Sequence, residues 1–88
     1  MPSFSNIDPK TAFGLRLREL RLKTGFSQEF LGELSGLDRT YISSCERGRR
    51  NATLEALHKL AFALGVPPST LLEPPGSLSS IVFVEGEK

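Results

Sequence analysis

The chain is divided into short segments of helical apolar spacing, each preceded by a residue that can begin a helix and followed by a glycine that can end one. Side chains suited to capping a helix N-terminus stand at four places: Asp8, Ser27, Asp38 and Thr53. Glycine, which readily adopts the left-handed conformation after a helix, follows at positions 25, 36, 48 and 65. These signals predict helices at about 9–24, 28–35, 39–47 and 54–64, and a short fifth helix from Pro67-Pro68 through Leu72. The expected fold class is therefore an all-α, five-helix domain.

The 88 residues are enough for one small hydrophobic core. We expect a flexible N-terminal arm at 1–8, a helical domain at 9–73 and a C-terminal tail at 74–88. The apolar residues expected to face the core are Phe13, Leu17, Leu20, Leu31, Leu34, Leu54, Leu57, Leu60, Ala61 and Leu64. The tail holds a β-branched and aromatic run that predicts a strand at 80–84. This strand either pairs with a second subunit, folds back on its own subunit or stays disordered.

The composition is that of an ordinary globular protein and excludes several functions. Hydrophobic residues make up 39% of the chain and charged residues 24%. The single cysteine, Cys45, excludes an internal disulfide and is expected to be a small core residue, and the single histidine, His58, has no neighbouring ligand. The chain has neither a Gly-rich phosphate loop nor a Ser–His–Asp set, so we expect no enzyme, no cofactor and no metal. Without a signal peptide or a membrane-spanning apolar run, the protein is expected in the cytoplasm.

The charges are distributed unevenly along the chain. The net charge of +1 is by itself weak evidence for nucleic-acid binding, but it combines +3 through Leu72 with −2 from Glu73 onward. Basic residues gather in two clusters: Arg16, Arg18, Arg21 and Lys23 in one, and Arg39, Arg47, Arg49 and Arg50 in the other. Because salt screens charges beyond about 8 Å, local clusters matter more for binding than the net charge does.

The predicted helix at 39–47 has an apolar side and a polar side. At about 100° per residue, Tyr41, Ile42 and Cys45 share one side. The opposite side carries short hydrogen-bonding and basic side chains: Arg39, Thr40, Ser43, Ser44 and Arg47. The ordinary alternative is a merely solvent-exposed face, but such faces usually carry Glu and Lys, which favour helices more than Ser and Thr do. With the preceding helix and the turn at Gly36, the pattern favours a helix-turn-helix whose second helix enters the major groove of DNA.

The ordered motifs of residues 13–72 resemble the Cro and phage-repressor type of helix-turn-helix proteins, also called the xenobiotic-response-element family. The matching pieces are Gly25-Phe26-Ser27-Gln28, Leu31, Gly36-Leu37, Tyr41-Ile42-Ser43, Glu46-Arg47-Gly48, Leu54-Glu55-Ala56-Leu57 and Ala63-Leu64-Gly65-Val66. Within them, residues 37–51 resemble the small controller proteins of restriction–modification systems, which share the Asp-Arg-Thr-Tyr-Ile-Ser run. The resemblance implies a lambda-repressor-like fold for the helical domain.

The resemblance also implies which side chains meet DNA. The implied base-reading residues are Arg39, Thr40, Tyr41, Ser44 and Arg50. The implied phosphate-binding residues are Ser27, Gln28, Ser43, Arg47, Asn51 and Thr53. Arg39 is the best candidate for a bidentate contact with guanine, which contributes about 1–3 kcal/mol of discrimination. Arg21 and Glu46 are implied to form an internal salt bridge that joins the first helix to the third.

The expected function is that of a sequence-specific, double-stranded DNA-binding transcriptional regulator associated with the nucleoid. One recognition helix reads few base pairs, so proteins of this family pair two-fold on half-sites about 34 Å apart, which implies a homodimer. The expected dimer-interface residues are Leu71, Leu72, Ile81, Val82, Phe83 and Val84. The alternative is an antitoxin-like DNA-binding protein whose C-terminal tail binds a protein partner.

Overall fold

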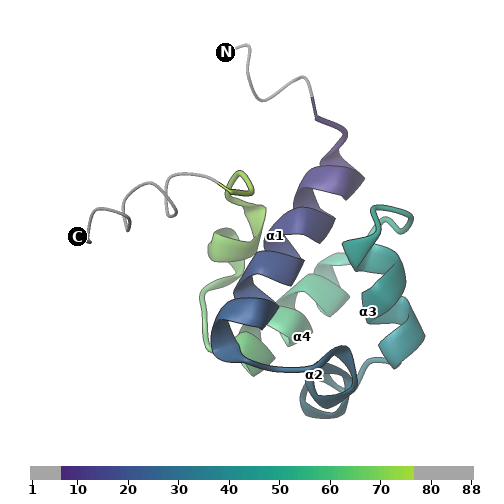
Figure 1. Ribbon diagram of the computed structural model, residues 1–88, viewed down its shortest axis with the longest axis vertical. Helices are drawn as coiled ribbons and strands as arrows, with labels where there is room; N and C mark the ends of the chain where they lie inside the picture. The colour runs from purple at the N-terminus through teal and green to yellow at the C-terminus, as the bar shows by residue number, and fades with distance from the viewer. Residues whose placement is uncertain (1–6, 77–88) are drawn as a thin grey trace, which may run out of the picture.

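The structure, a computed structural model, describes residues 7–76 and contains only helices in that range (Figure 1). They are α1 (Pro9–Thr24), α2 (Gln28–Ser35), α3 (Arg39–Glu46), α4 (Leu54–Leu64) and the 3-10 helix η2 (Pro68–Leu72). The all-α class is confirmed. The strand predicted at 80–84 and the first six residues of the arm predicted at 1–8 lie outside the described residues.

The predicted capping residues begin all four α-helices. The side chain of Asp8 accepts hydrogen bonds from the backbone of Lys10 and Thr11, and Ser27, Asp38 and Thr53 accept from the second or third residue of α2, α3 and α4. Glycines 25, 36 and 65 follow α1, α2 and α4 in the left-handed conformation. Local side-chain chemistry therefore sets most of the helix boundaries.

Two elements differ from the prediction. α3 ends at Glu46, one residue early, with Arg47 as its C-cap. The fifth helix is a 3-10 helix and not an α-helix, because the Thr70 N–H bonds to the carbonyl three residues back, that of Pro67, at 2.9 Å. With proline at its start and only five residues, this segment is too short for a stable α-helix.

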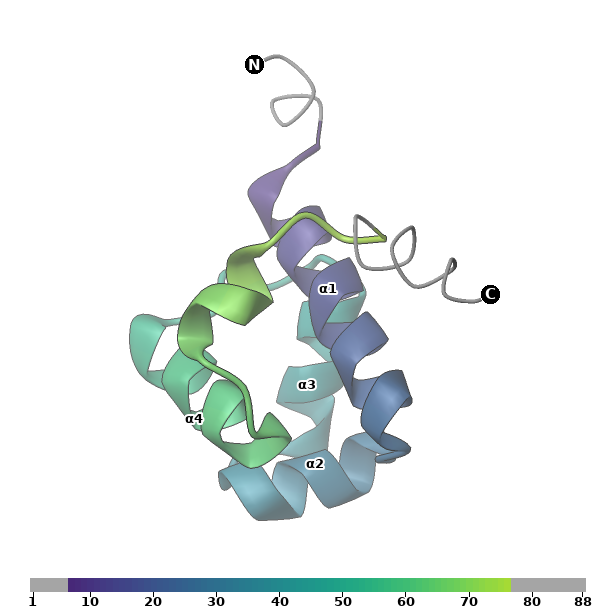
Figure 2. The same ribbon diagram turned by 90° about the vertical axis from the view of Figure 1, so that its left-hand side faces the viewer.

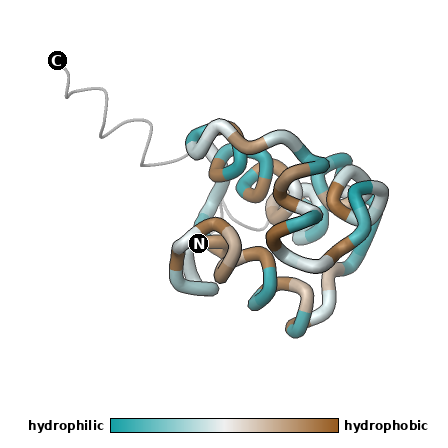
Figure 3. Tube along the Cα trace, turned by 90° about the horizontal axis from the view of Figure 1, so that it is seen from below, coloured by the Kyte–Doolittle hydropathy of each residue, from teal (hydrophilic) through white to brown (hydrophobic). Residues whose placement is uncertain are grey.

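The helices enclose one core to which every helix contributes. α1 packs against α3, α4 and η2, while α2 lies across one end against α3 and α4 (Figures 1 and 2). Each helix supplies one fully buried aliphatic side chain: Leu17, Leu31, Ile42, Leu60 and Leu71. Hydrophobic and hydrophilic stretches alternate along the helices, as Figure 3 shows, so that each helix has an apolar side to bury.

Two leucines predicted to face the core are exposed. Leu34 is 47% exposed because the buried face of α2 is formed by Leu31, Gly32 and Ser35, which place Leu34 to one side. Leu54 is 74% exposed because it is the first residue of α4, at the end of the helix.

Two glycines permit close approaches between backbones. A Cβ atom at Gly14 would collide with the carbonyl oxygen of Cys45, so α1 and α3 cross with their backbones in contact. A Cβ atom at Gly32 would lie 2.8 Å from the carbonyl oxygen of Leu37 in the turn between α2 and α3. The position of α3 on the domain thus depends on two side chains being absent.

Candidate nucleic-acid interface

A tight turn fixes α3 relative to α2. The backbone N–H groups of Gly36 and Leu37 both donate to the carbonyl of Gly32, at 2.8 and 3.1 Å, and the Leu37 side chain packs against the core. Asp38 then accepts from the Thr40 backbone and hydroxyl, each at 2.8 Å. These two hydrogen bonds hold the pKa of the Asp38 carboxyl below its usual value, since both favour the ionised form. The N-terminus of α3 therefore has a fixed, capped conformation.

The two sides of α3 face different surroundings. Ile42, Cys45 and Glu46 are buried against the domain. On the other side Arg39 and Thr40 are exposed, and Ser43 and Ser44 are half-buried. Arg47, just after the helix, is also exposed and donates to the Ser43 hydroxyl at 2.8 Å. The polar residues singled out from the sequence therefore share one accessible face.

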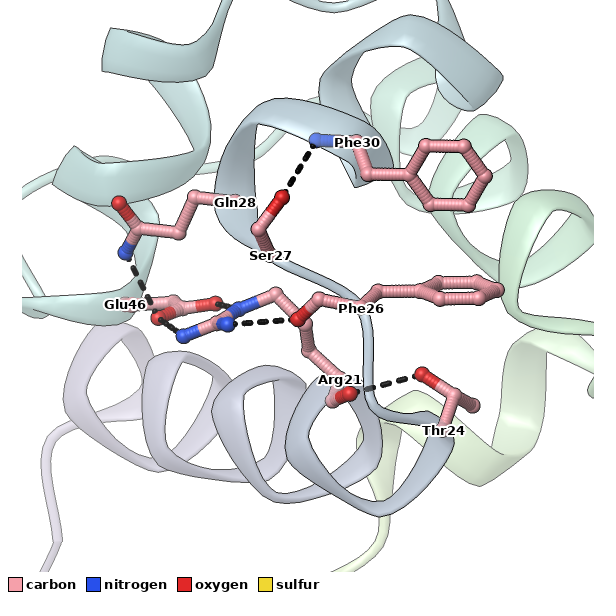
Figure 4. Close-up of polar contacts among 7 residues, drawn as sticks. All are labelled: Arg21, Thr24, Phe26, Ser27, Gln28, Phe30 and Glu46. Carbon is pink, nitrogen blue, oxygen red and sulfur yellow. Dashed lines mark hydrogen bonds and ion pairs between the residues drawn. The ribbon is translucent and has the colours of Figure 1, made fainter.

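A buried ion pair links α1 to α3, and a side chain of α2 donates a further hydrogen bond to it. The Arg21 guanidinium donates to both carboxylate oxygens of Glu46, at 2.6 and 2.9 Å, and to the Phe26 carbonyl at 2.9 Å (Figure 4). The Gln28 amide donates to the same carboxylate at 3.0 Å. The Arg21 and Glu46 side chains are 9% and 3% exposed. The hydrogen bonds to Glu46 raise the pKa of Arg21, so the guanidinium stays charged.

Several implied phosphate-binding groups already serve the fold. The Ser27 hydroxyl accepts from the Phe30 N–H at 2.9 Å, and the Thr53 hydroxyl accepts from the Ala56 N–H at 3.0 Å. Their positions at the starts of α2 and α4 place backbone N–H groups beside them, and helix N-termini attract anions. The cap geometry and an anion contact are compatible, because a capping hydroxyl still has its own proton to donate.

The segment after α3 adds three cations and an amide to the accessible face of that helix. Arg47, Arg49, Arg50 and Asn51 are all exposed. Within residues 7–76, no carboxylate forms an ion pair with Arg39, Arg47, Arg49 or Arg50. The guanidinium carbon of Arg50 lies 4.7 Å from the centre of the Tyr41 ring. This cluster of basic residues is therefore available to an external anion.

The basic cluster predicted on α1 is not one surface. Arg16 is buried and bonds to the Thr70 carbonyl, Glu19 and Glu73, at 2.9, 3.1 and 2.7 Å. Arg21 is buried as well, which leaves Arg18 and Lys23 exposed. Half of this cluster holds the fold together and cannot meet a ligand.

The single cysteine and the single histidine differ in burial. Cys45 is fully buried, as expected for a core residue, and burial raises the pKa of its thiol to about 11. His58 is exposed on α4, with Nδ1 2.8 Å from the Leu54 carbonyl oxygen. No helix within residues 7–76 has the length and apolar character needed to cross a bilayer.

The expected dimer-interface residues are separated by the structure. Leu71 is fully buried in its own subunit, which corrects its placement at an interface, whereas the neighbouring Leu72 is 66% exposed. The end of the fourth helix was also expected at the interface, and it carries Phe62, a residue not singled out from the sequence, which is 86% exposed. Its position could have been found, because Leu60, Ala61 and Leu64 define the inward face of α4 and Phe62 falls outside their arc. Residues 81–84 lie outside the described part.

Two short helices joined by a tight turn, the second with an accessible face of small polar and basic residues, form a DNA-binding helix-turn-helix. A family model described as a helix-turn-helix domain matches residues 12–73. Control protein C.BamHI of Bacillus amyloliquefaciens is 48% identical over 62 residues, covering 69% of this chain and 76% of its own length. A hypothetical transcription factor of Neisseria meningitidis is 43% identical over 75 residues, covering 85% and 69%.

A solved structure agrees in fold. The restriction–modification controller protein C.AhdI of Aeromonas hydrophila superimposes with a TM-score of 0.70 and 53% sequence identity, over 70% of this chain and 94% of that one. The chain therefore belongs to the helix-turn-helix domain family, as a DNA-binding transcription regulator close to the restriction–modification controller proteins and not an enzyme.

Proposed function

We propose that this protein is a sequence-specific, double-stranded DNA-binding regulator that acts as a homodimer on a two-fold operator, in the role of a restriction–modification controller. The observation that carries the proposal is the accessible face of α3, where hydroxyls and cations lie together with no carboxylate paired to the cations within residues 7–76. The likeness to C.BamHI and C.AhdI supports the controller role. The proposed location is the cytoplasm, at the nucleoid.

In this proposal the first turns of α3 read bases. Arg39 and Thr40 stand at the capped N-terminus of the helix, with Ser44 one turn further along the same face. Arg39 is exposed and has the fork geometry that matches guanine. Tyr41 and Arg50 are the remaining candidates for contacts with base edges.

The proposed phosphate contacts surround that face. Ser27, Gln28 and Thr53 stand at the starts of α2 and α4, where backbone N–H groups add to the attraction. Ser43, Arg47 and Asn51 supply hydroxyl, guanidinium and amide donors along α3 and its loop. Phosphate contacts of this kind set the position of α3 on the duplex and carry no sequence information.

The proposed dimer contact lies on α4. The exposed ring of Phe62 borders a mainly apolar groove of about 500 Å³ between α4 and the end of α2, lined also by Leu34, Ala61, Val66 and Pro68. A two-fold interface uses the same patch on both subunits. A projecting ring beside a groove fits that requirement, because Phe62 of each copy can occupy the groove of the other. Leu72 and the tail residues 81–84 are further candidates for the interface.

Selecting bound fragments from a random duplex pool tests the DNA-binding proposal. The expected outcome is a two-fold consensus with half-sites about one helical turn apart. A pool that shows no enrichment at moderate salt contradicts sequence-specific binding. An enriched but asymmetric single half-site contradicts the two-fold arrangement alone.

Sedimentation of a Phe62→Glu variant tests the dimer contact. The substitution is expected to shift the protein to monomer, since it removes the apolar ring that would fill the partner groove and puts there a carboxylate that is costly to desolvate. Leu22→Glu is the matched control, because Leu22 is an exposed leucine on α1, 53% exposed, and its replacement should leave the dimer unchanged. An unaltered dimer in Phe62→Glu removes α4 from the interface. A chain ending at Gly76 tests the tail in the same way.

A second candidate function is an antitoxin-like protein whose tail also binds a protein partner. The observation that favours it is an apolar cleft of about 550 Å³ where the described chain leads into the tail, lined by Phe13, Leu71, Leu72 and Pro75, among others. Purification from the native host tests it: a stoichiometric second protein, released when the tail is removed, supports this function. Its absence favours the regulator alone.

A further inference from the structure

Tyr41 and Arg50 come from different segments, and their side chains are in contact at the surface of α3. Tyr41 belongs to α3, and Arg50 belongs to the loop that follows it. The guanidinium carbon lies 4.7 Å from the centre of the Tyr41 ring, which is within the range of a cation–π contact. The contact is therefore made with the aromatic ring of Tyr41.

The loop that carries Arg50 is held in place up to the preceding residue. The Gly48 and Arg49 N–H groups donate to the carbonyls of Cys45 and Ser44, each at 3.0 Å. Gly48 has φ +73° and lies so close to Thr11 of α1 that a Cβ atom would come within 3.0 Å of the Thr11 hydroxyl oxygen. With its backbone held as far as Arg49, the loop places the Arg50 side chain beside α3, where the guanidinium lies against the Tyr41 ring.

In this position beside α3, the Arg50 charge also acts on the Cys45 thiol. The positive charge of Arg50 lowers the pKa of the Cys45 thiol and so opposes part of the larger rise caused by burial. Cys45 lies one turn from Tyr41 on α3, so the guanidinium stands over the body of the helix.

We propose that Tyr41 is a positioning residue that holds the Arg50 guanidinium beside α3 in readiness for DNA, a role that replaces its place above among the candidates for contacts with base edges. This inference rests on the proposed DNA-binding function. A free arginine side chain loses rotamer entropy when it binds. A guanidinium already stacked on a ring has lost part of that freedom in the unbound protein, so its contact with DNA is stronger. The face of the Tyr41 ring that Arg50 covers is closed to a base or a sugar.

A double-mutant cycle on DNA binding separates positioning from direct contact. The four proteins are the wild type, Tyr41→Leu, Arg50→Ala and the double variant, each titrated against the selected operator and against an unrelated duplex. An exposed cation–π contact corresponds to about two- to fivefold in affinity per protomer, so Tyr41→Leu is expected to weaken a dimer by about 4- to 25-fold. In the Arg50→Ala background the same change should cost less than about twofold. Equal losses in both backgrounds would mean that Tyr41 touches DNA directly and would overturn the inference.

Two controls sharpen the cycle. Arg49→Ala removes a neighbouring exposed arginine, and its effect should add to that of Tyr41→Leu without coupling. Tyr41→Phe keeps the ring and loses the hydroxyl, so it should bind within about twofold of the wild type. A loss in Tyr41→Phe as large as that in Tyr41→Leu assigns the role to the hydroxyl and contradicts stacking.

NMR chemical shifts test the contact between Arg50 and the Tyr41 ring in the absence of DNA. The side-chain protons of Arg50 should be shifted upfield by the ring current of Tyr41, should remain so in Tyr41→Phe and should return to ordinary values in Tyr41→Leu. Unshifted Arg50 protons in the wild type overturn the inference while leaving the proposed function standing. A wild type that prefers no duplex, with the shift intact, instead contradicts the DNA-binding function.

Discussion

The inward-facing and outward-facing arginines of this domain differ in their partners and not in their chemistry. Arg16 and Arg21 on α1 are buried, and their hydrogen bonds reach five residues: Glu19, Glu46, Glu73 and the carbonyls of Phe26 and Thr70. Arg39, Arg47, Arg49 and Arg50 are exposed, and no carboxylate of residues 7–76 forms an ion pair with them. The first set holds helices together, while the second set is available to a ligand.

This difference shows that a cluster of basic residues in a sequence does not by itself define a binding surface. A buried guanidinium needs nearly all of its donors satisfied, so it is fixed inside the fold. An exposed guanidinium has donors that face water. A phosphate or a guanine can accept two hydrogen bonds from it at once, which makes the contact strong and specific. Each prediction below tests whether a residue belongs to one set or the other.

The largest effect is expected for Arg21→Met. The substitution leaves the Glu46 carboxylate, 3% exposed, with Gln28 as its remaining side-chain donor. Breaking a buried pair on one side costs about 3–5 kcal/mol in the free energy of unfolding. Urea unfolding followed by circular dichroism measures it, and the double variant Arg21→Met with Glu46→Met should recover much of the loss. A change below about 1 kcal/mol would contradict the structural assignment.

The next effect is expected for Arg39→Ala, which should change recognition and leave stability nearly unaltered. Loss of a bidentate contact removes about 1–3 kcal/mol of discrimination at one base pair per half-site. Binding titrations against single-base operator variants measure it. Unchanged preference at every position, with normal overall affinity, would exclude Arg39 from base reading.

A smaller effect is expected for Arg47→Ala. A phosphate contact carries no sequence information, so all duplexes should weaken alike, and the slope of log affinity against log salt should fall by about 1 per protomer. The control is Arg18→Ala, which removes an exposed cation of α1 outside the proposed interface and should leave the slope unaltered. A sequence-dependent loss in Arg47→Ala would move this residue to the base-reading set.

The smallest effect concerns Asp38, the carboxylate next to Arg39. Its pKa is lowered mainly by the backbone and hydroxyl of Thr40 and only slightly by Arg39. A lowered pKa in the folded state means that Asp38 stabilises the fold above its unfolded pKa and that this contribution disappears as the pH falls through the folded pKa. In an NMR titration, Arg39→Ala should leave the Asp38 pKa lowered, whereas Thr40→Ala should bring it closer to the usual value. The reverse result would mean that Arg39 has an acidic partner after all.

Local signals predicted most of the fold, because caps and glycines act within a few residues of where they stand. Asp8, Ser27, Asp38 and Thr53 each begin a helix where the sequence placed it. The type of the fifth helix and the end of α3 were missed, since both depend on the last turn of a short segment, where α and 3-10 hydrogen bonds differ little.

Contacts between distant segments could not be predicted from spacing alone. The acceptors of Arg16 at Thr70 and Glu73 are 54 and 57 residues away along the chain. The sequence therefore gave no sign that this arginine has internal partners. The burial of Leu71 likewise follows from η2 folding back on α1, which no local pattern shows. The polar face of α3 was visible in the sequence because helix periodicity alone separates its two sides, whereas the stacking of Arg50 on Tyr41 required the loop geometry.

The missing side chain at Gly14 has a mechanical consequence. At this crossing the backbones of α1 and α3 are in direct contact, with no side chains between them that could change rotamer. Movement of α3 relative to α1 is therefore restricted. In the proposed dimer, any adjustment to the width or bend of a duplex would then have to come from tilting each subunit as a whole. The angle between two subunits, more than any movement inside one, would therefore set which operator spacings the protein tolerates.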